Sequence, residues 1–446
     1  MIEQIHTYRE AEAYISAIPK FSGKNSMEYT KLFLQHLGNP GQNSKIIHIA
    51  GTNGKGSVCA YLRSVLMESG ASVGMFISPH LETTRERISI GNDMIPEEEF
   101  VRIFEQVRRV VREDDRQCIL NGQEPGSNHP SYFEFLFMMA MTYFKEKAPE
   151  YIILETGLGG RLDATNSVSG KSVCVITEIG FDHMQYLGNT LEKIAGEKAG
   201  IMEPSVPVVF ADKRPSVTGI LKKYAEEKGC PVHFVTKDDI TEINIGNKTI
   251  DFSLRTGYYK YVGLSLNGSA CYQTENASLA VKTLEILMQK DKRICEESIR
   301  RGLMKAYWPG RMEEVFPGIY LDGAHNEDGI EAFLNSVKEI PCEGRRLLLF
   351  GVVQDKQYEK MIRQIASADL FSEVAVTVLE TDRSASLEKL REIWGQYKIC
   401  CFFHQDAQEA YHHLLSDRKE ADIIYIAGSL YLIGQMKSLM RRIPDD

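Results

Sequence analysis

A glycine-rich turn directly after an apolar run is the feature that most constrains this chain. Residues 45–57 read Lys-Ile-Ile-His-Ile-Ala-Gly-Thr-Asn-Gly-Lys-Gly-Ser, and a stretch with helical patterning follows. Glycines let backbone N–H groups converge on phosphate oxygens, a lysine adds a cation, and a serine hydroxyl can ligate Mg²⁺. A helix that starts here points its positive end at the anion. The pattern predicts a strand, a phosphate-binding loop and a helix, in that order.

The predicted loop departs from the strict phosphate-loop pattern at two positions. Ile49 stands where that pattern has a glycine, and Gly56 stands where it has Ser or Thr after the lysine. An ordinary surface turn is the alternative, but the apolar run before it and the helical pattern after it favour phosphate binding. The predicted nucleotide-binding residues of the loop are Gly51, Thr52, Asn53, Gly54, Lys55, Gly56 and Ser57.

The whole chain sets wider limits. At 446 residues it is long for a single core, so we expect two domains or more. The formal net charge of -9 gives no reason to expect nucleic acid as a partner. The first residues lack the order of a secretory signal and no stretch approaches a membrane span, so we expect a cytoplasmic protein without a membrane partner. The nine cysteines lack CxxC spacing, and we assign them no metal site or disulfide.

Short apolar runs alternate with amphipathic stretches from 45 to 235, which predicts a mostly parallel sheet covered by helices. The expected strands lie near 45–50, 72–77, 151–155, 172–178 and 206–210. The segment 131–147 is apolar nearly all round and predicts a helix buried against that sheet. Residues 114–130 are polar and contain Gly and Pro, which predicts a long loop.

The later part of the chain predicts a small antiparallel ribbon and then a second α/β domain. Two β-prone runs within 241–267 flank Arg255-Thr256-Gly257, and helical patterns fill 274–305. The expected strands after that lie near 318–322, 346–351, 373–378, 399–403 and 422–427, which fits a Rossmann-like fold. We therefore expect an α/β protein with a phosphate-loop ATP-binding domain at 1–305, a hinge at 306–312 around Pro309-Gly310, and a smaller domain at 313–446.

Three titratable side chains stand out beside the loop. Glu155 ends an apolar strand, where a nucleotide-bound Mg²⁺ needs an oxygen ligand, although a solvated strand-end glutamate is the alternative. His183 follows the next strand and either bonds a backbone carbonyl or binds a metal or phosphate. Lys198 lies among apolar neighbours on a predicted helix, and it either extends to solvent or has a role that composition cannot decide.

Several segments occur together in the order of the folylpolyglutamate synthase family of the Mur ligase superfamily, which the chain closely resembles over about residues 20–440. These segments are 51–57, Ser78-Pro79-His80-Leu81 with Glu86-Arg87-Ile88, 155–166, Asp182-His183, 197–201, Pro309-Gly310-Arg311 and Leu321-Asp322-Gly323-Ala324-His325-Asn326. So many motifs in one order are hard to produce by chance. The polar stretch 114–130 matches none of them.

The resemblance implies roles for the residues around the phosphates. Lys55 would hold the β- and γ-phosphates of ATP, and Ser57 with Glu155 would bind the Mg²⁺ that bridges them. His183 would ligate a second Mg²⁺. Lys198 would be carbamylated, which turns a cation into an anion that helps to organise the second metal.

The resemblance also implies roles further from the loop. Asn276 matches the adenine-side position, and Arg311 matches an arginine that reaches the ATP phosphates from the hinge. Asp322 and His325 match residues by which the C-terminal domain meets nucleotide and incoming glutamate.

The segment containing Ser78, His80 and Arg87 resembles the mobile loop that borders the folate site.

The activity implied is ATP-dependent addition of L-glutamate to a folate γ-carboxyl or to dihydropteroate through an acyl phosphate. The implied ligands are ATP, Mg²⁺ and these small-molecule substrates, and family likeness suggests a monomer. A cell-wall Mur ligase is one alternative, but the loop lysine at 55 leaves no room for the N-terminal domain that those enzymes carry. A nucleotide-dependent switch is the other alternative. The choice between folate and dihydropteroate, the length of the product chain and the preferred folate form stay open.

Overall fold

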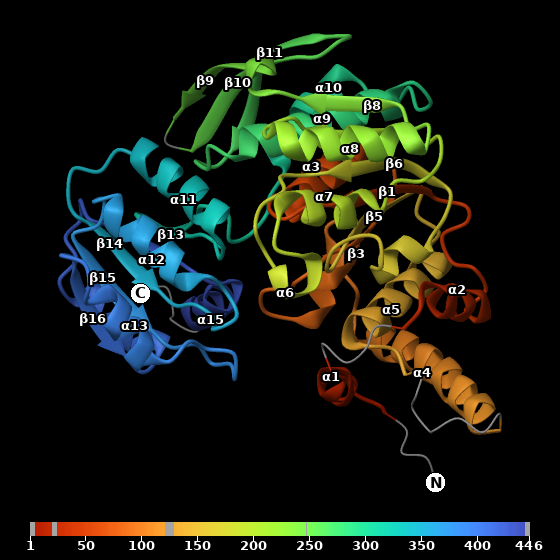
Figure 1. Cartoon of the computed structure of the whole chain (residues 1–446), viewed down its shortest axis with the longest axis horizontal. Helices are drawn as coiled ribbons and strands as arrows, with labels where there is room; N and C mark the ends of the chain where they lie inside the picture. The colour runs from red at the N-terminus through yellow and green to blue at the C-terminus, as the bar shows by residue number, and fades with distance from the viewer. Residues whose placement is uncertain (1–4, 20–24, 121–128, 247, 442–446) are drawn as a thin grey trace. The chain divides into compact units, whose positions relative to one another are not determined.

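The computed structural model describes residues 5–19, 25–120, 129–246 and 248–441. The chain divides into two compact units, and Figure 1 follows it from end to end. The first unit comprises 1–178, 192–236 and 279–302, and the second comprises 179–191, 237–278 and 303–446. The domain limits expected from the sequence stay a prediction. Among the described residues, no helix combines the length and the apolar character that crossing a membrane requires.

An eight-stranded sheet forms the first unit, with the order β4-β3-β2-β5-β1-β6-β7-β8. Its strands are β1 (Lys45–Ala50), β2 (Val73–Phe76), β3 (Ile88–Ile90), β4 (Asp93–Met94), β5 (Tyr151–Glu155), β6 (Lys171–Ile176), β7 (Val208–Ala211) and β8 (Val232–Val235). Neighbours from β2 to β8 pair in parallel, and only β3 and β4 pair antiparallel. This confirms the predicted mostly parallel sheet.

Two helices, α1 (Tyr8–Ala17) and α2 (Met27–His36), precede the first strand, and the others lie between later strands, as expected for a parallel sheet. These others are α3 (Lys55–Glu68), α4 (Glu97–Leu120), α5 (Tyr132–Lys147), α7 (Leu191–Ala199) and α8 (Pro215–Glu227), with the 3-10 turns η1 (Thr84–Arg87) and η2 (Ala164–Ser167). Two more helices, α9 (Gln273–Met288) and α10 (Glu296–Lys305), follow later in the chain.

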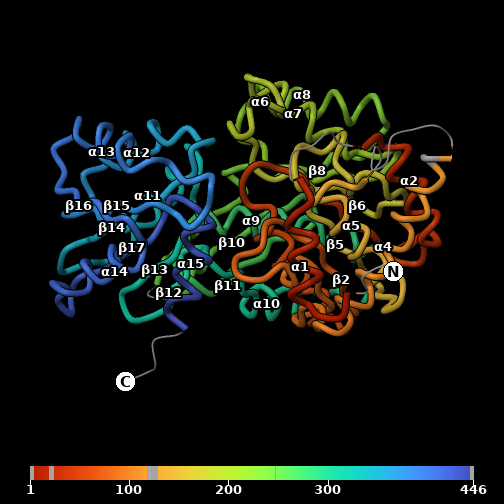
Figure 2. The backbone as a smooth tube through the Cα atoms, turned by 90° about the horizontal axis from the view of Figure 1, so that it is seen from below, coloured from red at the N-terminus to blue at the C-terminus, as the bar shows by residue number. Residues whose placement is uncertain are grey.

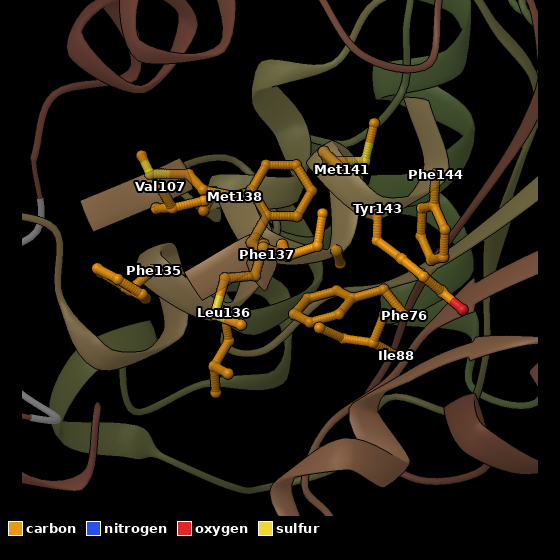
Figure 3. Close-up of a cluster of buried hydrophobic side chains, with 14 of the residues drawn as sticks. Phe76, Ile88, Val107, Phe135, Leu136, Phe137, Met138, Met141, Tyr143 and Phe144 are labelled. Carbon is orange, nitrogen blue, oxygen red and sulfur yellow. The ribbon is translucent and has the colours of Figure 1, made fainter. Parts of the chain in front are cut away.

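Helix α5 is the buried helix that the sequence predicted. Ser131 starts it with a capping box, in which its hydroxyl accepts from the N–H of Glu134 while the Glu134 carboxylate accepts from the N–H of Ser131. Its side chains enter a hydrophobic cluster of this unit, together with side chains from β2, β3 and α4 (Figure 3). Phe135, Phe137 and Phe144 are each at most 1% exposed. Such burial on several faces explains why this helix is apolar nearly all round.

The long loop predicted at 114–130 is wrong over its first part, because α4 continues through Leu120. Residues 114–120 contain no Gly or Pro, and the turn-forming residues begin only at Gly122. The polar residues 114–117 of this amphipathic helix were mistaken for the start of a loop. Residues 121–128 of the predicted loop lie outside the described residues, and 129–130 belong to no helix or strand, as predicted.

The second unit contains two sheets. A three-stranded antiparallel sheet has the order β11-β10-β9, formed by β9 (Ile240–Ile245), β10 (Thr249–Arg255) and β11 (Lys260–Asn267) after η3 (Lys237–Asp239). It confirms the predicted ribbon and adds a third strand. A six-stranded sheet has the order β12-β13-β17-β14-β15-β16. Its strands are β12 (Glu313–Phe316), β13 (Ile319–Leu321), β14 (Arg346–Phe350), β15 (Glu373–Thr377), β16 (Cys400–His404) and β17 (Ile423–Ala427).

The six-stranded sheet is parallel except for the edge strand β12, and this confirms the predicted Rossmann-like fold. Its helices are α11 (Glu327–Glu339), α12 (Tyr358–Ser367), α13 (Leu387–Trp394), α14 (Ala407–Ser416) and α15 (Leu430–Met440), and the short α6 (Met184–Leu187) also belongs to this unit. Helix α15 packs against α14, and Figure 2 shows α12 and α13 on one side of the sheet and α14 on the other. Right-handed crossovers place α14 opposite α12 and α13, because the chain reverses its direction across the sheet after β16.

Candidate active site

The predicted phosphate loop lies between β1 and α3 in the first unit. Gly54 is the residue before α3 and has φ +86°, a left-handed conformation that glycine adopts without strain. A Cβ on Gly51 would collide with the hydroxyl of Thr177. That hydroxyl donates to the carbonyl of Asn53 at 2.6 Å, and the N–H of Thr52 donates to the carbonyl of Glu178 at 2.7 Å. The two residues after β6, Thr177 and Glu178, therefore fix the loop by hydrogen bonds. Because Thr177 lies so close to Gly51, only a glycine fits at position 51.

Lys55 and Glu155 come together as the sequence predicted. Strands β1 and β5 are parallel neighbours, with Ile49 opposite Glu155, so the loop and the carboxylate emerge at the same edge of the sheet. The Nζ of Lys55 lies 3.8 Å from Oε1 of Glu155, which is 3% exposed. Oε2 accepts from the N–H of Ser78 at 3.0 Å. Glu155 is therefore a buried, oriented carboxylate and not a solvated strand end.

Magnesium suits the donors at this edge. Ser57 lies in the first turn of α3, is 2% exposed, and offers a hydroxyl oxygen beside the carboxylate-bearing strand, because α3 packs on β5. No three His, Cys, Asp or Glu side chains among the described residues form a ready-made metal site. Mg²⁺ in nucleotide sites takes one or two protein oxygens and completes its shell with phosphate oxygens and water. Ser57 and Glu155 fit that requirement.

Lys198 does not extend to solvent. It lies near the end of α7, is 4% exposed, and its Nζ donates to the carbonyl of Gly51 at 2.6 Å. The segment after Glu155 packs directly on this helix, because the N–H of Arg161 donates to the carbonyl of Glu197 at 2.8 Å. A buried amine on α7 thus touches the phosphate loop, in addition to the partly buried Lys55 within it. An ammonium has no lone pair for Mg²⁺, so Lys198 fits a metal only in a modified form.

The predicted folate-side residues form a separate part of the first unit. Nε of Arg87 donates to Nδ1 of His80 at 2.9 Å, and its guanidinium lies 5.3 Å from the ring centroid of Tyr132. Arg87 is 7% exposed. The N–H of Ser78 donates to Glu155, so a hydrogen bond links this turn to the carboxylate beside the phosphate loop.

The second unit holds another set of predicted residues around Asp182. Lys356 donates to Oδ1 of Asp182 at 2.6 Å, and Nε2 of His325 lies 3.8 Å from Oδ2. His183 follows Asp182 in a left-handed conformation with φ +49°, and its Nε2 lies 3.9 Å from Oδ1. Burial alone would raise the pKa of Asp182, but the Lys356 ammonium and the neighbouring imidazoles hold that pKa well below its usual range.

His325 is a neutral imidazole in this cluster. Its Nδ1 donates to the carbonyl of Gly323 at 2.7 Å, because a carbonyl can only accept. Burial, reinforced by the nearby Lys356 ammonium, lowers the pKa of His325 to about 3. The lone pair of Nε2 therefore stays available on the side of Asp182.

Asp322 is fixed from three directions. It is 2% exposed and accepts from the hydroxyl of Tyr272 at 2.6 Å, from the N–H of Met312 at 2.9 Å and from the N–H of Ala324 at 2.8 Å. Burial raises its pKa despite these bonds and the nearby guanidinium of Arg311.

Arg311 itself donates to the carbonyl of Gly310 at 2.8 Å. Asn276 is 7% exposed, and its amide donates to Oε1 of Gln273 at 3.0 Å.

Sequence reasoning missed Lys356 and assigned no role to Asp182. Lys356 follows β14 in the polar segment Val353-Gln354-Asp355-Lys356, at the carboxyl edge of a buried parallel strand. That is the same signal that pointed to Glu155, and it was not applied to the second domain.

Comparisons with known proteins show which protein families this chain resembles. The family model described as the Mur ligase middle domain matches residues 49–284, and the one described as the Mur ligase glutamate ligase domain matches 310–430. The dihydrofolate synthase/folylpolyglutamate synthase of Bacillus subtilis is 34% identical, covering 97% of this chain and 99% of the relative.

Solved structures agree. The Escherichia coli FolC complex with DHPP and ADP has a TM-score of 0.85 at 26% identity, and the alignment covers 99% of both chains. A Mycobacterium tuberculosis folylpolyglutamate synthase complexed with ADP and AMPPCP has a TM-score of 0.86 at 26% identity, covering 98% of this chain and 99% of that chain. These relatives are ligases and do not support a nucleotide switch. The chain belongs to the folylpolyglutamate and dihydrofolate synthase family of ATP-dependent Mur ligases.

Proposed function

We propose that this protein adds L-glutamate to the γ-carboxyl group of a folate, to dihydropteroate, or to both, with hydrolysis of ATP to ADP and phosphate. One observation carries the proposal. A loop lysine, two Mg²⁺-type oxygen donors and a second buried lysine gather at one carboxyl edge of the parallel sheet, as Lys55, Ser57, Glu155 and Lys198. Membership of a ligase family supports the same reaction.

The reaction needs such a site because a carboxylate is a poor electrophile. Transfer of the γ-phosphoryl group from ATP to the substrate carboxylate forms an acyl phosphate. The glutamate amine then attacks the acyl carbon, a C–N bond forms, the C–O bond to phosphate breaks, and the amine loses a proton. Both steps bring anions together, so fixed positive charge and oriented N–H groups stabilise the transition states.

We assign the phosphate-binding roles to the first unit's loop. Lys55 and the backbone N–H groups of 51–57 would hold the β- and γ-phosphates, and Arg311 would add a guanidinium from the second unit. Ser57 and Glu155 would hold a Mg²⁺ ion, which supplies charge neutralisation for the transferring group when it is bound. Asn276 would contact the adenine side.

A second metal site is part of the proposal. His183 would supply an imidazole and Lys198 a carbamate, formed when its neutral amine attacks CO₂ and loses a proton. The carbamate replaces a cation by an oxygen donor, which is the ligand type that Mg²⁺ prefers. The carbamate nitrogen keeps one hydrogen, so it can still donate to the carbonyl of Gly51.

The substrate contacts complete the proposal. Ser78, His80 and Arg87 would border the folate, while Asp322 and His325 would meet nucleotide and the incoming glutamate. Hinge motion at 306–312 would exclude water from the acyl phosphate.

The test is ADP release measured with each substrate omitted in turn. We expect release only when L-glutamate and either tetrahydrofolate or dihydropteroate are both present, and a panel of the two acceptors identifies the preferred one. Lys55→Ala should abolish release, whereas Lys31→Ala, an exposed lysine on α2, should not. Nucleotide hydrolysis that runs equally well without either substrate would refute the proposal. A monomer in solution and a cytoplasmic location are also proposed, and sedimentation and cell fractionation test them.

A further inference from the structure

A buried histidine in the strand before the phosphate loop has no part in the mechanism above. His48 lies in the middle of β1, and its side chain is completely buried. Desolvation, with the Lys171 ammonium nearby, holds the pKa of His48 well below its usual value, so the imidazole is neutral. A completely buried polar ring in a central parallel strand calls for a reason, since an apolar side chain packs there more favourably.

The hydrogen bonds identify what His48 does. Its Nε2 lies 2.8 Å from the hydroxyl oxygen of Thr165, and that hydroxyl lies 2.6 Å from Oδ1 of Asp163. A carboxylate oxygen can only accept, so the Thr165 hydroxyl donates its one proton to Asp163 and must accept a hydrogen bond from His48. His48 therefore carries its proton on Nε2 and donates. Its Nδ1 is a buried acceptor with no partner among the described residues.

An unpartnered buried acceptor is unfavourable. It makes His48 a poor choice for packing alone. The side chain is therefore explained by its one hydrogen bond to Thr165 and by what lies beyond it.

Asp163 links the His48–Thr165 hydrogen bond to the backbone of the segment that follows Glu155. Its Oδ2 accepts from the N–H groups of Gly157 at 3.0 Å and Leu158 at 2.9 Å, while Oδ1 also accepts from the N–H of Thr165 at 3.1 Å. Asp163 is 2% exposed. Four donors thus converge on one buried carboxylate, and they set the path of the backbone directly after the proposed metal ligand.

The same segment continues onto the helix that carries Lys198. Beyond Asp163, the side-chain amide of Asn166 donates to the carbonyls of Arg161 and Gly200, at 3.2 Å each. At its start, the N–H of Thr156 donates to the carbonyl of Ile49 at 2.9 Å. Residues 156–166 are therefore bound to β1 at one end and to the end of α7 at the other.

We propose that His48 is a positioning residue, which acts through Thr165 and Asp163 to hold the 156–166 segment and thereby fixes Glu155 and Lys198 for metal and nucleotide. This rests on the proposed function, because that function assigns Glu155 and Lys198 their roles. His48 itself touches neither substrate nor metal. Partners that orient ligands in this indirect way commonly change metal affinity by about 10- to 100-fold when they are removed.

The closing experiment measures Mn²⁺ binding to the full-length protein in the presence of ADP, with free Mn²⁺ followed by electron paramagnetic resonance. We expect His48→Leu and Thr165→Val each to weaken binding by about tenfold or more. His48→Gln places an amide N–H near the position of Nε2 and should stay within about threefold of wild type. The double variant His48→Leu/Thr165→Val should bind Mn²⁺ as tightly as whichever single variant has the lower Mn²⁺ affinity, since the two substitutions break the same chain of hydrogen bonds.

Hydrogen exchange gives a readout that needs no ligand. Amides in the peptide containing Gly157 and Leu158 should exchange about tenfold faster in His48→Leu, as expected from one weakened hydrogen bond, and at the wild-type rate in His48→Gln. Thr283→Val is the matched control, because Thr283 is also completely buried and its hydroxyl donates to Leu279 within α9. If His48→Leu fails to fold, Thr165→Val carries the test.

The outcomes separate cleanly. Wild-type protein that binds no Mn²⁺ with ADP refutes the proposed function and this inference with it. Wild-type protein that binds, with His48→Leu and Thr165→Val binding equally well, refutes the inference alone. Equal losses in Thr165→Val and Thr283→Val, or in His48→Leu and His48→Gln, would show a general packing effect and would also refute it.

Discussion

Gly200, the residue that follows helix α7, leaves no room for a side chain. A Cβ added there would lie 2.5 Å from Cα of Arg161 and closer still to its Cβ. Carbon atoms pack best at about 3.5–4.0 Å, so Gly200→Ala must separate the two backbones by about 1 Å. Forcing an extra methyl into packed structure costs about 1–3 kcal/mol. Because both partners are backbone or near-backbone atoms, no flexible side chain can relieve the contact.

The displacement should also reduce activity. Lys198 lies two residues before Gly200, and a misplacement of about 1 Å near reacting groups can lower a rate by about 100-fold. We therefore expect Gly200→Ala to lose about 1–3 kcal/mol of stability and up to about 100-fold in turnover. Gly219→Ala on α8 is the matched control. It has nothing within 4 Å of its added Cβ, and it should gain about 0.5–1 kcal/mol from helix propensity.

The assay is urea unfolding followed by far-ultraviolet circular dichroism, with scanning calorimetry as a second measurement. Tryptophan fluorescence is unsuitable, because the two tryptophans, Trp308 and Trp394, both belong to the second unit. Gly196→Ala within α7 should fall between the other two variants, since its nearest neighbour is the hydroxyl of Tyr224 at 3.2 Å. The reasoning is refuted if Gly200→Ala is as stable as Gly219→Ala, or if it loses stability but keeps full turnover.

Three further predictions concern charged residues. Lys198→Ala should nearly abolish ligase turnover and recover part of it when a short-chain carboxylate is added, and an unimpaired variant would remove Lys198 from the mechanism. Arg311→Ala should lower kcat far more than it raises the folate KM, whereas equal rates in variant and wild type would contradict its assignment to the transferring phosphoryl group. Burial of Asp422 is outweighed by its bonds to Arg345, which lower its pKa to about 2. A carboxyl whose pKa is lower in the folded than in the unfolded chain stabilises the fold at pH values above the unfolded-state pKa. The stability advantage of wild type over Asp422→Asn should therefore vanish as the pH falls from about 4 to about 2, which acid unfolding of both proteins measures.

The sequence predicted the phosphate loop and most strands of the two larger sheets. It also predicted that Glu155 and Lys198 follow that loop along the chain. These features depend on local signals. Glycines at 51 and 54 are needed wherever a backbone must approach a phosphate, and apolar runs bounded by turns identify buried strands. The end of α4 was missed because polar residues such as those at 114–117 occur on solvated helix faces as well as in loops.

The tertiary structure decided which of the predicted residues meet. That Glu155 faces Lys55 depends on β5 being the parallel neighbour of β1, a pairing that the sequence does not specify. The ion pair of Lys356 with Asp182 joins residues 174 positions apart, so no local pattern reveals it. Propensity and periodicity act over a few residues, whereas a site is assembled by long-range packing. The sequence by itself therefore determined which segments form helices and strands and which reactive side chains they carry. The tertiary fold determined which of those side chains contact one another.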